Sequence, residues 1–301
     1  MLISPAVLLF ALFLTEQNID EASASESRYF EELDSGVEAF YMADWEKAES
    51  IFQQLILNYP DRPEAYFFRA MKPFWTYFFA GEEAAAADEF LNQSERAITV
   101  TKRRLEEAPD DTTSVLMLGG LYGYRSLVAA NEGHYRTAMS SGIDGYRYSR
   151  KLMGMESNDP NALIGQGVFN YMSGTIPRSL RWLGSIAGVS GEKNKGFELL
   201  EKASKDGSKV SGDARMILTY LYLKEDKPEE AVRVIEPLCE QFPDNPIFQF
   251  YLAKALEASG KNSRAAEKYL KVVELDHPSL QHLKDKSRDR LQMGSLEFTG
   301  I

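Results

Sequence analysis

The chain has 301 residues, 44% of them hydrophobic, and a formal net charge of −11. This hydrophobic fraction predicts a globular protein and excludes a largely disordered one. The negative charge argues against a nucleic-acid partner, because such binding depends on Lys and Arg side chains that neutralise phosphates. Cys239 is the single cysteine, so no internal disulfide can form, and its place in a helical pattern predicts a small buried side chain.

The N-terminus carries an apolar run from Leu2 to Leu14 that is too short to cross a bilayer but has the length of a signal-peptide core. An Ala-Ser-Ala triplet at 22–24 offers a cleavage site before Ser25. No Lys or Arg precedes the run, and the stretch before the triplet is acidic. We expect residues 1–24 to direct export to a periplasm or cell envelope. The alternatives are a cytoplasmic protein, or an uncleaved apolar helix that packs on the first repeat or makes peripheral contact with a membrane.

The first predicted helix pair begins near Ser27, and its second helix, from Trp45 to Asn58, places the small residue Ala48 ahead of an apolar ridge. The same order returns near the C-terminus, where Ala231 and Ala265 lie 34 residues apart. The ridges and the helix ends of those two repeats keep this offset: Ile235, Leu238 and Pro243 in one, and Tyr269, Val272 and His277-Pro278 in the other. This resembles the tetratricopeptide repeat, a two-helix unit with a small residue at the helix crossing and a proline that ends the second helix.

That resemblance implies an all-α fold, a right-handed superhelix of about twelve helices and no strands. A two-helix unit cannot bury its apolar face alone, so neighbouring units must stack, and the curvature of the stack leaves a concave surface. We expect one solenoid over residues 27–292, followed by a C-terminal tail at 293–301. The polar, charged sequence from Pro278 to Leu291 predicts a last helix that caps the stack.

The middle repeats are less regular. Pro73 lies inside the first helix of repeat two and should kink it, and the second helix, from about Glu82 to Glu107, is longer than usual. An insertion at about 173–190, rich in Gly, Ser and Pro, interrupts repeat four before a helix that starts at Lys193. A regular solenoid does not need this segment, and long insertions in compact folds are often functional, so we interpret it as a lid.

A closer resemblance follows from three segments, VLMLGGLYGYRSLVAANEGHY, NDPNALIGQGVFNYMSG and IPRSLRWLGSIAGVSGEKNKGFELLEKA. Their order resembles a family of bacterial envelope-associated tetratricopeptide proteins and, more distantly, the eukaryotic tetratricopeptide 39 and Iml2 group. The resemblance covers roughly residues 29–273. It implies no reaction, cofactor or specific ligand.

Catalytic and metal-binding patterns are missing from the sequence. His134, His277 and His282 are widely spaced and have no Cys or carboxylate at ligand spacing, which argues against a metal site. There is no G-x-S-x-G motif, and Glu192 breaks the match of the glycines before Lys193 to a phosphate-binding loop. We therefore expect no enzyme activity, no catalytic residue, no cofactor and no metal.

The inward-facing positions of the first helices are mostly aromatic, whereas a solvated groove should be polar. Together with the insertion they form the candidate ligand-binding or partner-binding set: Phe40, Tyr41, Phe67, Phe74, Trp75, Tyr124, Arg178, Arg181, Trp182, Tyr220 and Phe250. Two explanations stay open. The insertion folds into the groove as a plug, or part of the lining stays open for an apolar ligand or an amphipathic helix, with Arg178 and Arg181 meeting an acidic group.

The function that follows from these patterns is a non-enzymatic scaffold that binds an unidentified protein or peptide in a bacterial envelope. The alternative is a carrier of an apolar or lipid-like small molecule in the aromatic groove. An open apolar cavity would favour the carrier, and a filled groove would favour the scaffold.

Overall fold

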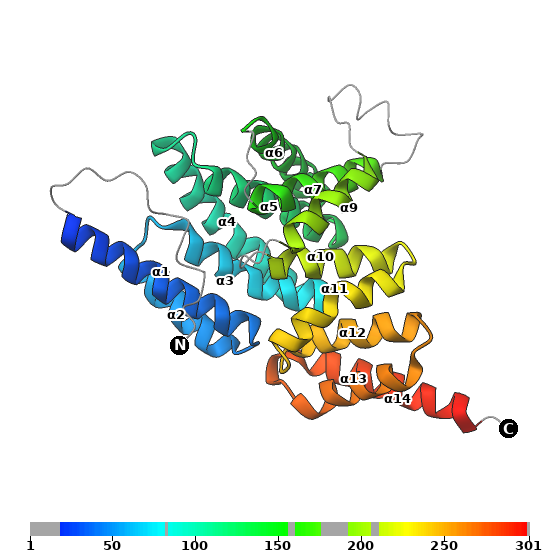
Figure 1. The fold of residues 1–301 in the computed structure, drawn as a ribbon. Coiled ribbons are helices and arrows are strands. Elements are labelled where there is room, and N and C mark those ends of the chain that lie inside the picture. The colour runs from blue at the N-terminus through cyan, green and yellow to red at the C-terminus, as the bar shows by residue number, and fades with distance from the viewer. Residues whose placement is uncertain (1–18, 82–83, 156–159, 176–191, 206–210, 300–301) are drawn as a thin grey trace.

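The computed structural model describes residues 19–81, 84–155, 160–175, 192–205 and 211–299 (Figure 1). Within these ranges the chain is all-α, with thirteen α-helices packed in pairs and no strand. The pairs are α1 (Ile19–Tyr41) with α2 (Trp45–Asn58), α3 (Pro63–Trp75) with α4 (Ala84–Glu107), α5 (Thr112–Asn131) with α6 (Tyr135–Gly154), α7 (Pro160–Gly174) with α9 (Lys193–Ser204), α10 (Ser211–Lys224) with α11 (Pro228–Gln241), and α12 (Pro246–Ala258) with α13 (Asn262–Leu275). A 3-10 turn, η4 (Pro278–Leu280), leads into α14 (Gln281–Thr299).

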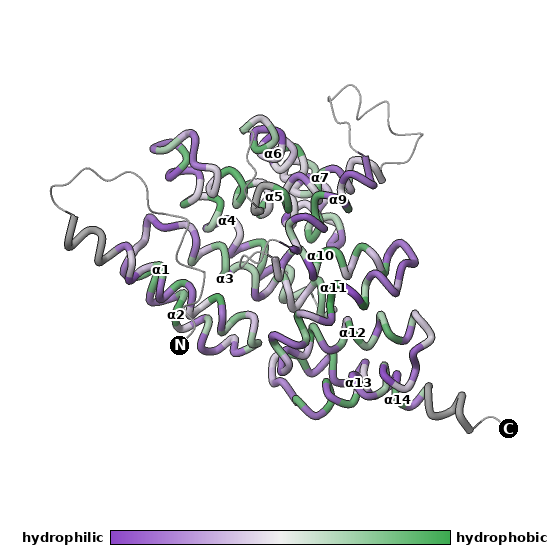
Figure 2. The backbone as a smooth tube through the Cα atoms, viewed as in Figure 1, coloured by the Kyte–Doolittle hydropathy of each residue, from purple (hydrophilic) through white to green (hydrophobic). Residues whose placement is uncertain are grey.

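Each pair stacks on the next, as in a tetratricopeptide superhelix. The first helices follow one another along the inside of the stack, where α1 contacts α3, α3 contacts α5, and α10 contacts α12. These helices are apolar on several sides, and most residues of α12 are buried. In Figure 2 the hydrophobic stretches lie toward the middle of the stack and the hydrophilic ones toward its turns and ends. The core is therefore a continuous inner layer.

The predicted helix crossings are confirmed. Ala48, Ala231 and Ala265 are no more than 2% exposed, as expected for small residues where paired helices approach closely. The Asn245 side chain accepts hydrogen bonds from the backbone amides of Ile247 and Phe248, so it caps α12. These local signals set the frame of the solenoid.

Pro73 changes the course of α3, as the sequence predicted. The helix passes into one π-helical turn, η2 (Thr76–Ala80), which ends at Gly81 with a φ of 73°. Proline has no amide hydrogen for the α-helical ladder, and the Thr76 hydroxyl donates to the Pro73 carbonyl at 3.0 Å. Within this turn Thr76 and Phe79 are buried, whereas Tyr77 and Phe78 stay half-buried.

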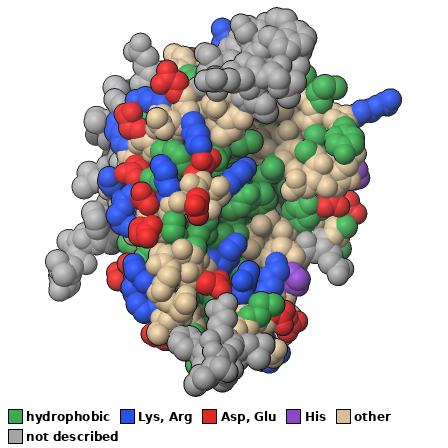
Figure 3. Space-filling model, turned by 90° about the vertical axis from the view of Figure 1, so that its right-hand side faces the viewer, with side chains coloured by type: hydrophobic (Ala, Val, Ile, Leu, Met, Phe, Trp, Pro, Cys, Tyr) green, Lys and Arg blue, Asp and Glu red, His purple; other side chains and the backbone are tan. Residues whose placement is uncertain are grey.

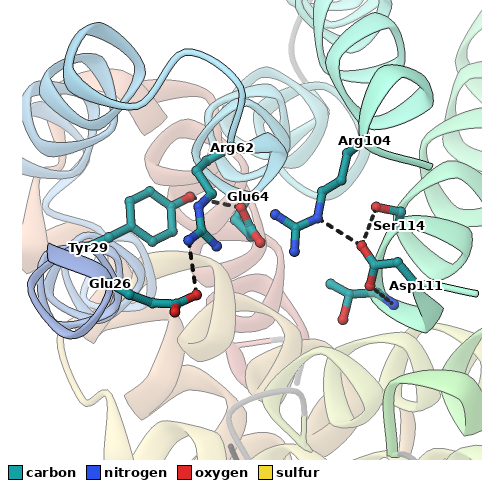
Figure 4. A network of polar contacts seen from close by, with 8 residues as sticks. Glu26, Tyr29, Arg62, Glu64, Arg104, Asp111 and Ser114 are labelled. Carbon is teal, nitrogen blue, oxygen red and sulfur yellow. Dashed lines mark hydrogen bonds and ion pairs between the residues drawn. The ribbon is translucent and has the colours of Figure 1, made fainter. Parts of the chain in front are cut away.

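A polar network holds the outer edge of the first repeats together (Figure 4). The Tyr29 hydroxyl donates to the buried Glu64 carboxylate at 2.9 Å, and Arg62 lies over the Tyr29 ring while it pairs with Glu26. Nearby, Asp111 caps α5 and accepts hydrogen bonds from Ser114 and Arg104. Although burial acts to raise the pKa of Asp111, these hydrogen bonds lower it, so the carboxylate stays charged and keeps its cap.

Two boundaries differ from those predicted. α1 begins at Ile19, so it includes the 22–24 triplet, whereas the sequence placed the first helix near Ser27. α14 continues to Thr299, past the expected end of the solenoid at residue 292 and into the expected tail, because helix-forming residues follow Leu291 without a proline. No helix among the described residues is long and apolar enough to cross a membrane.

The crossing at Ala265 can be tested against its exposed neighbour. Replacing Ala265 by Leu should overpack the α12–α13 contact and destabilise the fold by about 1–3 kcal/mol, whereas Ala266→Leu on the solvent side of the same turn should change stability little. Urea denaturation of both variants measures the difference. Equal midpoints would show that the repeat frame is wrong.

Candidate functional site

The two ends of the solenoid contact each other and close its inner surface. The Tyr41 hydroxyl at the end of α1 donates to Asp213 on α10 at 2.5 Å, and the Asn245 side-chain amide donates to the Tyr41 carbonyl at 2.8 Å. The Tyr41 ring also stacks on Phe242, with ring centres 5.4 Å apart. Residues about 200 positions apart in the sequence therefore meet, and in Figure 1 the α1–α2 turn lies beside the start of α12.

A second contact strengthens this closure. His277 Nδ1 accepts the backbone amide of Ser279, so Nε2 carries the proton and donates to the Ala43 carbonyl at 2.7 Å. Ala43 has a φ of 62°, a left-handed conformation that costs a non-glycine residue roughly 1–2 kcal/mol. Trp45 packs edge-on against the His277 ring. His277 thus has the structural role that its place at a repeat end predicted.

Five of the predicted lining residues are part of the buried core. Phe40, Tyr41, Phe74, Trp75 and Phe250 are at most 7% exposed, so they do not line an open groove, which was one of the two explanations left open by the sequence. Trp75 contacts the rings of both Phe40 and Tyr41. For Tyr41 and Trp75 the physical reason is the closure, because Phe242 and Phe248 of the C-terminal repeats pack on rings that would be open in an extended superhelix.

The remaining predicted residues have mixed positions. Phe67 is half-buried and packs against Phe68 in the outer part of α3. Tyr124 and Tyr220 are half-buried on the inner surface, where they meet other aromatic residues. Arg178, Arg181 and Trp182, with most of the 173–190 insertion, lie outside the described residues. The choice between a plug and a lid thus stays a prediction.

Half-buried aromatic side chains form a strip on the inner surface. Phe74 joins Tyr124 of α5, at 4.4 Å between ring centres, to Phe78 of η2, which in turn contacts Tyr220 of α10 at 5.0 Å. Phe79 then connects Tyr220 to Tyr251 of α12. We call Phe78, Tyr124 and Tyr220, which remain partly exposed, the aromatic strip. The face shown in Figure 3 has a hollow filled with hydrophobic side chains and bordered by Lys and Arg.

Two lysines lie at the α12 end of the aromatic strip. The Lys254 ammonium lies over the Tyr251 ring, 5.3 Å from its centre, and Lys286 of α14 donates to the Ala80 carbonyl at 3.4 Å. Burial lowers the pKa of Lys254, and the positive charges of Lys286 and Arg290 lower it further. Burial also lowers the pKa of Lys286. Positive charge is therefore concentrated here in an acidic protein, and an added anionic group would be stabilised.

The sequence analysis missed Phe78, Lys254 and Lys286. Phe78 belongs to the aromatic run after Pro73, and a π-helical turn changes which residue of such a run faces inward. The two lysines come from different repeats, 32 residues apart, and nothing local marks them as neighbours. Only the packing of α14 against α12 brings them together.

Burial raises the pKa of the Cys239 thiol to about 12, so it stays protonated, in agreement with the predicted buried side chain. The described residues contain no group of His, Cys, Asp and Glu side chains that could hold a metal ion. A cleft of about 420 Å³ between α11 and α13 is lined by charged side chains such as Glu236 and Arg264, which already pair at 2.6 Å.

The closure places the Asp213 carboxyl where burial makes its ionised form unfavourable. Burial raises its pKa to about 6, while the Tyr41 hydrogen bond acts in the opposite direction. The pKa of this carboxyl is higher in the folded state than in the unfolded state, where it is about 4. Its contribution to the stability of the fold is therefore present below pH 4 and is lost as the pH rises through about 6. Asp213 is thus ionised at pH 7 with no cation in contact among the residues described.

Asp213→Asn should therefore stabilise the fold at pH 7 by about 1–3 kcal/mol, because a neutral amide still accepts the Tyr41 hydrogen bond without a buried charge. The advantage should shrink as the pH falls from 6 to 4. Urea midpoints at pH 7 and pH 4.5 measure this, with the exposed Asp289→Asn as control. A loss of stability at pH 7 would mean that the carboxylate charge itself holds α1 on α10.

Comparisons with known proteins agree with the fold. Residues 37–62 and 220–278 match two family models, each described as a tetratricopeptide repeat, and no curated protein matches the chain. A structure of an IFIT1 monomeric mutant with Gppp-AAAA aligns over 84% of this chain and 54% of its own length, at 15% identity and a TM-score of 0.43. This chain thus spans about half of that relative. The P58(IPK) TPR domain aligns over 88% of this chain and 99% of its own, at 15% identity and a TM-score of 0.27.

Both TM-scores are too low to carry an argument about function. The matched segments lie in the first repeat and in the last regular repeats, at the two ends that meet in the closure. The segments between them continue the same pairwise packing of helices. The chain therefore contains segments similar to tetratricopeptide repeats, at residues 37–62 and 220–278.

Proposed function

We propose that this protein is a non-enzymatic scaffold that binds a segment of another protein on the aromatic strip. Tetratricopeptide domains typically bind proteins or peptides. The observation that carries the proposal is the partial exposure of Phe78, Tyr124 and Tyr220 on the inner surface of a closed superhelix. Rigid aromatic side chains that keep one face accessible provide contact area at low entropic cost, as in other protein interfaces.

The packing supports a scaffold over a lipid carrier. A carrier needs an interior space that can enclose an apolar molecule. Here Trp75 contacts Phe40, Tyr41, Phe79 and Phe248, so aromatic rings fill the centre of the superhelix. The surface that remains is a shallow strip, which suits an extended or helical segment with a few apolar side chains.

The lysines at the end of the strip indicate an acidic group on the bound segment. Lys254 and Lys286 are both half-buried, and Lys254 is near a third cation, Arg290. Arg290 has a carboxylate partner, Glu257, at 3.6 Å, whereas the two lysines have no ion pair among the described side chains. A carboxylate brought here by the partner would reduce their mutual repulsion. Arg178 and Arg181 of the insertion lie outside the described residues and remain predicted contacts for an acidic group of the partner.

We also propose that the protein acts in a bacterial cell envelope or periplasm. The support is the apolar run from Leu2 to Leu14, the triplet at 22–24 and the resemblance of the middle repeats to envelope-associated tetratricopeptide proteins. Cleavage before Ser25 would leave a shorter α1 that still contains Tyr29 and Tyr41, the residues that connect it to the other repeats. The alternative of a cytoplasmic protein predicts an intact N-terminus.

Site-specific crosslinking tests the binding surface. With p-benzoylphenylalanine at Tyr220, irradiation in the native host should give a discrete crosslinked protein, and the same group at the exposed Leu57 of α2 should not. Adding Lys254→Gln and Lys286→Gln should weaken the crosslink several-fold if the partner carries an acidic group. Thermal melting confirms that each variant is folded. The same crosslinked products at both positions would contradict the proposal.

Processing of the N-terminus is tested separately. Mass spectrometry of the protein purified from its native host should find a chain that begins near Ser25, in a periplasmic or envelope fraction. Replacing both alanines of the 22–24 triplet by bulky residues should block processing, because signal peptidases require small side chains there. Recovery of intact Met1 in the cytosolic fraction would refute export.

A further inference from the structure

Exposed hydrophobic side chains are concentrated on one outer part of the solenoid. Among the described residues, eight large hydrophobic side chains are at least 48% exposed, and four of these lie on the neighbouring helices α6 and α7. Tyr135, Met139 and Ile143 of α6 are 74%, 68% and 53% exposed, and Met172 of α7 is 50% exposed. The other four are spread over the turn after α1 and over α2, α13 and α14. Single exposed residues are normal, but a contiguous group marks an interaction site.

The spacing shows that α6 has two apolar faces. Gly145 and Leu152 face α5 and are buried, which accounts for one face. Tyr135, Met139 and Ile143 follow at intervals of four residues on another face, and half-buried Tyr146 continues it toward α7. The Tyr146 ring contacts Phe169 of α7 at 5.4 Å. The α6 row and the α7 residues Phe169 and Met172 therefore form one surface, which we call the outer patch.

Positive charges border the outer patch. α6 carries Arg136, Arg147, Arg150 and Lys151 against a single acidic residue, Asp144, which gives the helix a formal charge of +3 in a chain of −11. α7 carries no charged residue. Asp144 pairs with Arg147 at 2.8 Å, but both are surface residues, so this pair contributes little and can exchange with another carboxylate. The patch thus combines an apolar centre with a cationic rim.

We propose that the outer patch is a second binding site, for an amphipathic helix of a partner protein with an apolar stripe and acidic flanks. The row of exposed apolar side chains on α6, together with Phe169 and Met172 on α7, matches the surface that two neighbouring helices offer to a third helix. A partner helix would bind there through apolar side chains at positions i, i+3, i+4 and i+7. Acidic flanking residues would meet the arginines of α6. This site lies on α6 and α7, whereas the aromatic strip lies on η2, α5 and α10, so it does not depend on the proposed function of the strip.

The composition of the patch favours a protein partner over a membrane. Tyr, Met and Arg are enriched in protein interfaces, whereas helices that lie on membranes expose mainly Trp, Phe and Leu toward the lipid. None of the four highly exposed residues is Trp, Phe or Leu. A second copy of this chain is disfavoured because both copies carry a net charge of −11 and repel each other during encounter.

The experiment uses a defined probe and the full chain. A fluorescein-labelled peptide of about 18 residues, with Leu at the i, i+3, i+4 and i+7 positions and Glu on its flanks, is titrated with the protein and followed by fluorescence anisotropy. We expect it to bind about tenfold more tightly than a scrambled peptide of the same composition. Met139→Glu/Ile143→Glu should weaken binding about tenfold or more, because it removes apolar contacts and adds like charges. Both replaced side chains are exposed, so circular dichroism melting should be unchanged.

Controls separate this site from its alternatives. Leu57→Glu, a matched change at an isolated exposed leucine, should leave peptide binding unchanged. Arg147→Gln/Arg150→Gln should reduce the affinity several-fold and flatten its salt dependence. Equal binding of the scrambled peptide would overturn the proposal. So would flotation with phosphatidylglycerol vesicles that depends on Met139 and Ile143, or dilution-dependent self-association in sedimentation that those two changes abolish.

Discussion

The contact between the first and the last repeats is the interaction on which the rest of the structure depends. Tyr41 makes it through its ring, its hydroxyl and its backbone carbonyl, which meet Phe242, Asp213 and Asn245 respectively. His277 adds a hydrogen bond to Ala43, whose left-handed backbone is held in place by it. Because burial and the nearby Asp213 carboxylate raise the pKa of Tyr41, its hydroxyl remains a donor over the physiological range. These few contacts of Tyr41 and His277 therefore hold the two ends of the solenoid together.

This closure converts a would-be groove into a core. In an extended superhelix Phe40 and Trp75 would face solvent on the concave side, but here they contact each other, and Trp75 also contacts the Phe248 ring of α12. The surface left accessible is the aromatic strip, with Lys254 and Lys286 at one end. Charged groups in this region are partly buried, and burial shifts their pKa values, upward for Asp213 and downward for Lys254. The chemistry of the inner surface is thus set by how tightly the ends meet.

The two surfaces of the molecule differ in a way that suits a scaffold. The inner strip is aromatic, half-buried and next to half-buried lysines, whereas the outer patch on α6 and α7 is more exposed and accompanied by arginines. The two surfaces lie on different helices. A scaffold with two such surfaces would bring two proteins together.

The sequence by itself determined the repeat fold, because its signals are local. The alanine at each crossing and the prolines act within one helix pair, and most of the helices they predicted are found with nearly the same ends. The sequence also named most residues of the inner layer, including Tyr41 and Trp75, since apolar periodicity reports which side of a helix faces inward. Whether that layer is a groove or a core depended on Asp213, Phe242 and His277, which come from repeats far along the chain. Only the tertiary structure decided this, because the curvature of a solenoid is the sum of small rotations between repeats, and no local pattern shows whether its ends will meet.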